Sequence, residues 1–154
     1  MATMLCTLRH GRATGQGPDA ALLPEGEAAV ARLGRRLARE GLRPVAAYSS
    51  PYRRARETAA IVLGELACGL DPVLLEALAP DTEPAEALEA LRAHGLPDGA
   101  VLVVTHLPLV GRLAGAIAGA TLDFPPGAWA EYVLAPGGRT GTFRRWLGPG
   151  GDGG

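Results

Sequence analysis

Two of the three histidines in the sequence follow directly on short apolar runs. His10 stands in the triplet RHG, next to Arg9, and His106 comes immediately after the run AVLVVT. Arg54 follows a third apolar run by a few residues. A neutral imidazole with one free ring nitrogen can act as a nucleophile, and arginine side chains bind phosphoryl oxygens through paired N–H donors. Together these residues favour a site that binds or transfers a phosphoryl group.

The elements that must position these residues can be predicted from the spacing of apolar side chains. Brief apolar runs bounded by turn residues predict buried strands at residues 4–8, 44–48 and 100–105. Apolar residues at helical spacing, with proline or glycine near the ends, predict helices at residues 24–40, 51–67, 83–94 and 108–118. Strands that alternate with helices predict a mainly parallel sheet covered on both faces, which is a three-layer α/β/α sandwich.

The last part of the sequence predicts an antiparallel hairpin. Residues 128–135 and 141–146 form two strand-like runs on either side of a Pro-Gly-Gly-Arg turn. A chain of 154 residues is long enough for one core, so we expect a single domain over residues 1–147. Residues 148–154, with the sequence GPGGDGG, are expected to form a flexible tail.

The candidate residues are expected to meet at one edge of the predicted sheet. Ligands of such sheets bind beyond the carboxyl ends of the parallel strands, where Arg9, His10 and His106 are expected to lie. Arg54 is expected in the first turn of its helix, where the helix dipole repels a cation and a bound anion reverses that effect. Ser50 is expected to cap that helix, because no GxSxG sequence marks it as a nucleophile.

Composition excludes several classes of partner. The net charge of −1 gives no general attraction to nucleic acid or to anionic membranes, so any phosphate site must be local. All 15 basic residues are arginine. The two cysteines, Cys6 and Cys68, have no metal-ligand spacing and are expected to be reduced thiols of a cytoplasmic protein. No apolar stretch is long enough to span a membrane.

No metal or other cofactor is expected at the candidate site. Arginines accompany His10 and His106, and no carboxylate ligands stand beside the two histidines. A single histidine at the end of a strand is more often structural than functional. The functional interpretation therefore depends on the two histidines occurring together with Arg9 and Arg54.

Three motifs carry a resemblance to a known family. LRHGRA, SSPYRRARETA and VTHLPLVGRL, in this order and at the ends of the predicted strands, resemble the histidine phosphatase superfamily, which includes the phosphoglycerate mutases. The segments HLPLVG and LLEALAPDTEP further resemble the SixA-type phosphohistidine phosphatases. The similarity extends from about residue 4 to residue 147. It implies a phosphoglycerate mutase-like fold.

The resemblance also implies a role for each candidate residue. His10 would accept the phosphoryl group, and water would then hydrolyse the phosphohistidine. Arg9, Arg54 and His106 would bind the phosphoryl oxygens, with His106 cationic. Glu76 stands where many members of the superfamily carry an acid that protonates the leaving group. SixA-like sequences often have an acidic residue after RHG, whereas this sequence has an arginine, Arg12, which either adds a third cation to the site or points to solvent.

The expected substrate follows from the short segments around the site. Residues 12–24 and 76–84 are too short to cover a small ligand, which favours a phosphorylated side chain on another protein, such as a phosphotransfer domain. One alternative is a phosphatase of a small sugar- or nucleotide-derived phosphate monoester, and a second is an inactive phosphate-binding module. The chain is expected to be a monomer or a weak homo-oligomer.

Overall fold

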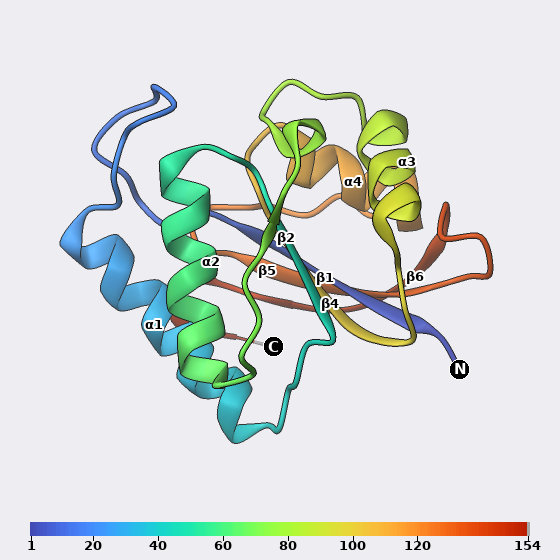
Figure 1. The fold of residues 1–154 in the computed structure, drawn as a ribbon, viewed down its shortest axis with the longest axis horizontal. Coiled ribbons are helices and arrows are strands. Elements are labelled where there is room, and N and C mark those ends of the chain that lie inside the picture. Colours follow the sequence, from blue (N-terminus) through green and yellow to red (C-terminus); the bar gives the residue numbers. More distant parts are fainter. Residues whose placement is uncertain (154) are drawn as a thin grey trace.

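Strands and helices alternate along most of the chain in the computed structural model, which describes residues 1–153 (Figure 1). The strands are β1 (Thr3–Arg9), β2 (Ala46–Ser49), β3 (Val73–Leu74), β4 (Gly99–Thr105), β5 (Trp129–Leu134) and β6 (Gly141–Leu147). The α-helices are α1 (Pro24–Arg39), α2 (Arg53–Leu66), α3 (Pro84–His94) and α4 (Leu109–Ala118), and two short 3-10 helices are η1 (Glu76–Leu78) and η2 (Pro149–Gly151).

All six strands belong to one sheet with the order β3-β2-β4-β1-β5-β6. The four strands from β3 to β1 run parallel to one another, whereas β5 pairs antiparallel with β1, and β6 pairs antiparallel with β5. The predicted mainly parallel sheet and the C-terminal hairpin are both confirmed. Strand β4 lies between β2 and β1, which explains why its sequence is apolar without interruption.

Helices cover both faces of the sheet, as Figure 1 shows. Leu8 and Val104 face one side and pack with the apolar residues of α1 and α2. Leu5 and Val103 face the other side and pack with α3 and α4. Because successive side chains of a strand point to opposite faces, each buried strand contributes to both cores. The predicted three-layer α/β/α sandwich is therefore confirmed.

The register of the parallel strands aligns their carboxyl ends. Arg9, the last residue of β1, pairs with Thr105, the last residue of β4. Ser49, the last residue of β2, pairs with Val104. The residues that come directly after these strands therefore leave the sheet at the same level, and they include both candidate histidines.

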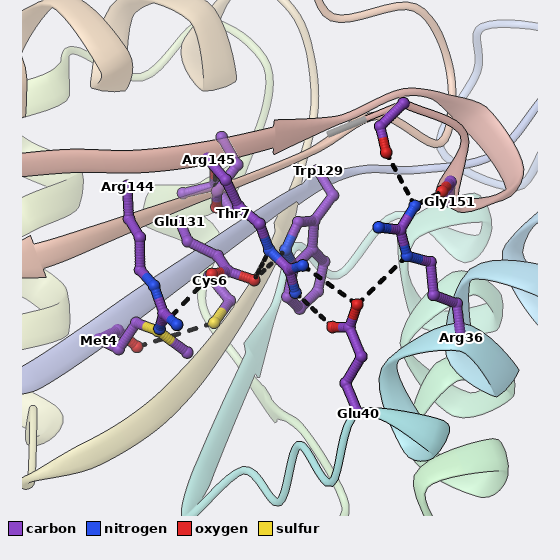
Figure 2. A network of polar contacts seen from close by, with 12 residues as sticks. Met4, Cys6, Thr7, Arg36, Glu40, Trp129, Glu131, Arg144, Arg145 and Gly151 are labelled. Carbon is purple, nitrogen blue, oxygen red and sulfur yellow. Dashed lines mark hydrogen bonds and ion pairs between the residues drawn. The ribbon is translucent and has the colours of Figure 1, made fainter.

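A network of polar contacts joins the hairpin to α1 (Figure 2). The carboxylate of Glu131 on β5 is buried, and it accepts hydrogen bonds of 2.9 Å from Trp129 Nε1 and 2.9 Å from Arg145 Nε on β6. Arg145 also binds Glu40, the residue after α1, with an N–O distance of 2.5 Å. Arg36 of α1 donates to Glu40 and to the carbonyl oxygen of Gly151. These contacts tie together segments that lie far apart in the sequence.

One local prediction differs from the structure, and a short helix lies within the predicted tail. Helix α2 begins at Arg53, with Tyr52 as its N-cap, so the expected capping by Ser50 is wrong. The hydroxyl of Ser50 accepts the N–H of Tyr52 in the turn before the helix instead. Residues 149–151, expected within a flexible tail, form η2 and are bonded to α1 through Arg36. The last residue of that predicted tail, 154, lies outside the described residues.

No helix within residues 1–153 is long and apolar enough to cross a membrane.

Candidate active site

The imidazole of His10 is held in one tautomer by the residue that follows it. Its Nδ1 lies 2.8 Å from the carbonyl oxygen of Gly11. A carbonyl oxygen only accepts hydrogen bonds, so Nδ1 carries the proton, and Nε2 keeps its lone pair. The side chain is buried, with 7% exposed. His10 is therefore the neutral imidazole with one unprotonated ring nitrogen that the sequence analysis considered as a nucleophile.

Arg54 contacts that free nitrogen. Its Nε lies 3.2 Å from His10 Nε2 and donates to it, and its Nη1 donates to the carbonyl oxygens of Gln16 and Gly17 at 3.1 and 2.8 Å. The guanidinium also lies over the ring of Tyr52, with 5.0 Å between Cζ and the ring centroid. Arg54 is the second residue of α2, which confirms its predicted place in the first turn. A phosphoryl group on Nε2 would lie within reach of this guanidinium.

His106 lies on the other side of His10. The centroids of the two rings are 5.0 Å apart. His106 Nε2 is 2.7 Å from the hydroxyl oxygen of Ser50, and the ring of Tyr52 meets the His106 ring edge to face at 4.8 Å. Ser50 and His106 come directly after β2 and β4, so the aligned strand ends account for their contact.

Arg9 completes the group of cations. Its Nη1 donates to the carbonyl oxygen of Phe124 at 2.9 Å, and its Nε is buried and has no hydrogen-bond partner within residues 1–153. The Nδ1 atom of His106 is likewise buried and without a partner in that part of the chain. Buried polar atoms without partners are rare in folded proteins, and two of the four found within residues 1–153 belong to side chains that line this one cleft.

The cleft has a volume of about 600 Å³ and lies at the carboxyl edge of the parallel strands. Arg9, His10, Arg54 and His106 all line it, so the structure brings these four predicted site residues together. Arg12 also lines the cleft, but Glu76 does not. Glu76 is exposed at the start of η1, and the acidic residue that does line the cleft is Asp81.

Burial and positive charge keep both histidines neutral. Burial lowers the pKa of His10 to about 4, and the charges of Arg54 and Arg9 act in the same direction, against the hydrogen bond to Gly11. Burial, with the charges of His10, Arg54 and Arg9, lowers the pKa of His106 to about 3. Burial also lowers the pKa of each arginine. The expectation that His106 is cationic concerns the phosphate-bound site and stays a prediction, because an anion bound beside the ring would raise its pKa.

The segment between β1 and α1 is fixed to α2 beside the cleft. The N–H of Gly11 donates to the hydroxyl of Thr58 at 3.1 Å, and the N–H of Leu22 donates to Glu57 at 2.8 Å. Gly26, near the start of α1, packs so closely on the backbone of Arg12 that a Cβ there would overlap the Arg12 carbonyl oxygen. These contacts explain how a glycine-rich segment holds the RHG residues in place.

Sequence reasoning missed the contacts of Ser50 and Tyr52 with His106. The pair Ser-Ser before a helix suggested a cap, because serine is common at that position. The only signal that could have revealed their role is the position of Ser50 directly after a parallel strand, which is also the position of His10 and His106.

Fold and geometry together define a class of protein: an α/β sandwich that presents a neutral histidine in an arginine-lined cleft. The model of the histidine phosphatase superfamily, branch 1, matches residues 5–83. The chain belongs to this superfamily, whose members are phosphatases and related phosphoryl-transfer enzymes. No curated protein matches the sequence as a relative.

Solved structures agree with this assignment. The structure of the protein histidine phosphatase SixA complexed with tungstate has 25% sequence identity and a TM-score of 0.85, over 94% of this chain and 96% of that chain. A protein from Agrobacterium tumefaciens, provisionally assigned as a phosphohistidine phosphatase SixA, has 20% identity and a TM-score of 0.79, over 97% and 100% of the two chains. A mycobacterial glucosyl-3-phosphoglycerate phosphatase has 18% identity and a TM-score of 0.72, over 94% and 97%.

Proposed function

We propose that this protein is a phosphohistidine phosphatase that removes the phosphoryl group from a histidine of another protein. The single observation that carries the proposal is the hydrogen-bonded orientation of His10, whose unprotonated Nε2 faces Arg54 inside the cleft. A neutral nitrogen nucleophile surrounded by fixed cations suits attack on a negatively charged phosphoryl group, because the cations stabilise the charge of the transition state.

The reaction has two steps. In the first, the lone pair of His10 Nε2 forms a bond to phosphorus, and the bond from phosphorus to the substrate nitrogen breaks. The substrate imidazole leaves with the electron pair and takes a proton from solvent. In the second, a water oxygen bonds to phosphorus, the bond to Nε2 breaks, and its electron pair returns to His10. The water releases a proton to solvent, and inorganic phosphate leaves.

The other residues of the cleft stabilise charge in both steps. Arg54 and the buried Nε of Arg9 offer N–H donors to phosphoryl oxygens. Ser50 orients the His106 ring through a contact of 2.7 Å, and the Nδ1 of that ring is available to a phosphoryl oxygen. The side chains are held in the cleft before the substrate arrives. The Arg54 N–H that binds His10 Nε2 must turn to a phosphoryl oxygen when Nε2 attacks phosphorus.

Phosphohistidine as substrate is supported by the similarity to SixA and by the chemistry of the leaving group. The SixA structure is that of a protein histidine phosphatase, and its complex contains an oxyanion, tungstate. Glu76 lies outside the cleft of this protein. An imidazole leaves readily once it is protonated, so a strong general acid is unnecessary for phosphohistidine. Hydrolysis of an alkyl phosphate ester depends more strongly on a general acid, because an alkoxide is a poor leaving group.

A small phosphate monoester is the second candidate substrate. The observation that favours it is the mycobacterial glucosyl-3-phosphoglycerate phosphatase, because the structural match extends over 97% of that chain. Asp81 could serve as a proton donor for such an ester, since its carboxylate lines the cleft.

The test compares the two substrate classes under metal-free conditions. Phosphate release from a chemically phosphorylated phosphotransfer domain is measured beside a panel of small sugar and nucleotide phosphates, each in parallel assays with and without EDTA. We expect kcat/KM for the phosphohistidine protein to exceed that for every small ester, with no loss in EDTA. A preference of several orders of magnitude for one ester would replace the proposed substrate, and inactivation by EDTA would exclude the metal-independent reaction.

A further inference from the structure

Arg12 is the one cation of the cleft whose side chain is exposed and unengaged. Its guanidinium makes no hydrogen bond or ion pair with any of residues 1–153, although it lines the same cleft as His10 and Arg54. By contrast, Arg54 and Arg9 are bound to backbone carbonyl oxygens beside the nucleophile. The cleft therefore has an inner group of fixed cations and a further cation at its rim.

The backbone of Arg12 is nevertheless held firmly. Its carbonyl oxygen accepts the N–H of Leu23 at 2.9 Å, and Gly26 packs directly against its backbone. Thus the start of the side chain is fixed two residues from His10, while its charged end remains free to meet a ligand. A ligand can therefore bind this guanidinium without breaking an existing hydrogen bond or ion pair.

The inner cations, Arg9 and Arg54, already supply positive charge that balances the negative charge of a phosphoryl group. A phosphoryl group on His10 Nε2 would contact Arg54 and lie beside two buried nitrogens that have no partner within residues 1–153, Nε of Arg9 and Nδ1 of His106. Arg12, at the rim, would face the part of the substrate that carries the phosphoryl group. An anion at that place would gain an ion pair with a planar guanidinium. Asp81, also on the cleft lining, would repel an anion placed near it and so restrict the position of the second charge.

We propose that Arg12 is a specificity-determining residue that binds a carboxylate adjacent to the phosphohistidine on the substrate protein. The inference rests on the proposed function, because it assumes that the phosphoryl group is delivered to His10 by a protein. It further defines the substrate: the surface around the phosphohistidine carries an aspartate or glutamate next to it.

The test uses two peptides that differ in one residue. Each contains one histidine phosphorylated chemically with phosphoramidate, preceded by glutamate in one peptide and by glutamine in the other. The ratio of kcat/KM for the two peptides is measured for the wild type, Arg12→Ala, Arg12→Glu and a control, Arg139→Ala. Arg139 is exposed in the β5–β6 turn, at the end of the sheet away from the cleft.

We expect the wild type and Arg139→Ala to prefer the glutamate peptide by about three- to fivefold at low salt, as for an exposed ion pair. The preference should disappear in Arg12→Ala, reverse in Arg12→Glu, and shrink as salt is added. An equal ratio in the wild type and Arg12→Ala would overturn the proposal, whatever the absolute rates.

A second pair of probes separates this proposal from the proposed function. Phenyl phosphate and 4-carboxyphenyl phosphate differ in the same way but contain no peptide. If neither peptide is hydrolysed and the carboxylated ester is preferred through Arg12, the proposed function fails and the second anion belongs to a small ester. If the protein hydrolyses none of the probes, the dissociation constants of the two esters are measured by titration calorimetry. The role of Arg12 is overturned if each ester has the same dissociation constant in the wild type and in Arg12→Ala.

Discussion

Two clusters of charged side chains in this protein contain buried groups, and they differ in how the charge is balanced. At the hairpin, Arg145 lies between the carboxylates of Glu131 and Glu40, at 2.9 and 2.5 Å. In the cleft, Arg9 and Arg54 hydrogen-bond to backbone carbonyl oxygens and to a neutral histidine, and to no carboxylate within residues 1–153. The first cluster is neutralised by the protein itself, whereas the second leaves positive charge for a ligand.

The difference assigns a separate purpose to each cluster. Removing one partner of a buried ion pair leaves an uncompensated charge and destabilises the folded state. Repelling cations that are held together with no carboxylate in contact do not help folding, and their retention is expected where they bind an anion. Substitutions in the hairpin network should therefore reduce stability with little effect on activity. Substitutions in the cleft should reduce activity with little effect on stability.

The largest effect is expected for His10→Ala. The substitution removes the nitrogen proposed to accept the phosphoryl group, so hydrolysis should fall to background, while the free energy of unfolding changes little in comparison. Phosphate release and urea unfolding are measured on the same preparation. Hydrolysis at more than a few per cent of the wild-type rate would place the nucleophile elsewhere.

Glu131→Ala should cause the largest loss of stability. Its carboxylate is only 1% exposed and binds both Trp129 and Arg145, so its removal should cost about 3–5 kcal/mol of unfolding free energy. Glu89→Ala is the matched control, because the Glu89–Arg92 pair is exposed and should contribute less than about 1 kcal/mol. Both are measured by urea unfolding. Similar losses of unfolding free energy in the two variants would show that the hairpin network stabilises the fold no more than an exposed ion pair does.

Arg54 and Arg145 should give opposite results when each is replaced by alanine. Arg54→Ala should lower kcat/KM by about 100-fold, or roughly 3 kcal/mol, because it removes a preorganised donor from the transition state. Arg145→Ala should keep kcat/KM within a few-fold and lower the unfolding free energy instead, since it breaks the contacts with Glu131 and Glu40. If Arg145→Ala reduced kcat/KM as much as Arg54→Ala, the separation between the two clusters would be wrong.

The depressed histidine pKa values predict how stability depends on pH. The pKa of His10 is 6.5 without perturbation and about 4 in the folded protein, so between these values the unfolded chain binds more protons. The contribution of neutral His10 to stability is therefore complete above pH 6.5 and is lost as the pH falls towards 4. His106 acts in the same direction, down to about pH 3.

His10→Asn provides the measurement, because asparagine does not titrate. Between pH 6.5 and 4 the unfolding free energy of the wild type should fall more steeply than that of the variant, by at most about 1.4 kcal/mol per pH unit. Identical slopes would contradict the buried neutral state of His10. NMR titration of the His10 ring, with no change above pH 5, provides an independent check.

The smallest effect is expected at Glu76. Glu76→Gln should change kcat less than Asp81→Asn does, because the carboxylate of Asp81 lines the cleft and that of Glu76 is exposed outside it. The probe is a small phosphate ester. A larger loss of kcat in Glu76→Gln than in Asp81→Asn would support Glu76 as the general acid that the family resemblance implies.

Most of the fold and the centre of the site could be predicted from local patterns in the sequence. Apolar runs marked β1, β2 and β4, and the general behaviour of parallel sheets placed His10, Arg54 and His106 at one edge. The hairpin network could not be predicted, because Glu40 and Arg145 come together only through tertiary packing. The neutral state of His106 was also inaccessible, since it depends on burial and on the combined field of the neighbouring cations.

The most direct test is to trap the phosphoryl group on the protein. Wild-type protein is mixed with a phosphoryl donor labelled with ³²P and quenched in alkali, where phosphohistidine survives, and the label is then mapped by peptide mass spectrometry. We expect an acid-labile label on His10, present in Arg145→Ala and absent in His10→Ala. Turnover of the donor with no label at any time, or with label on another residue, would contradict the account.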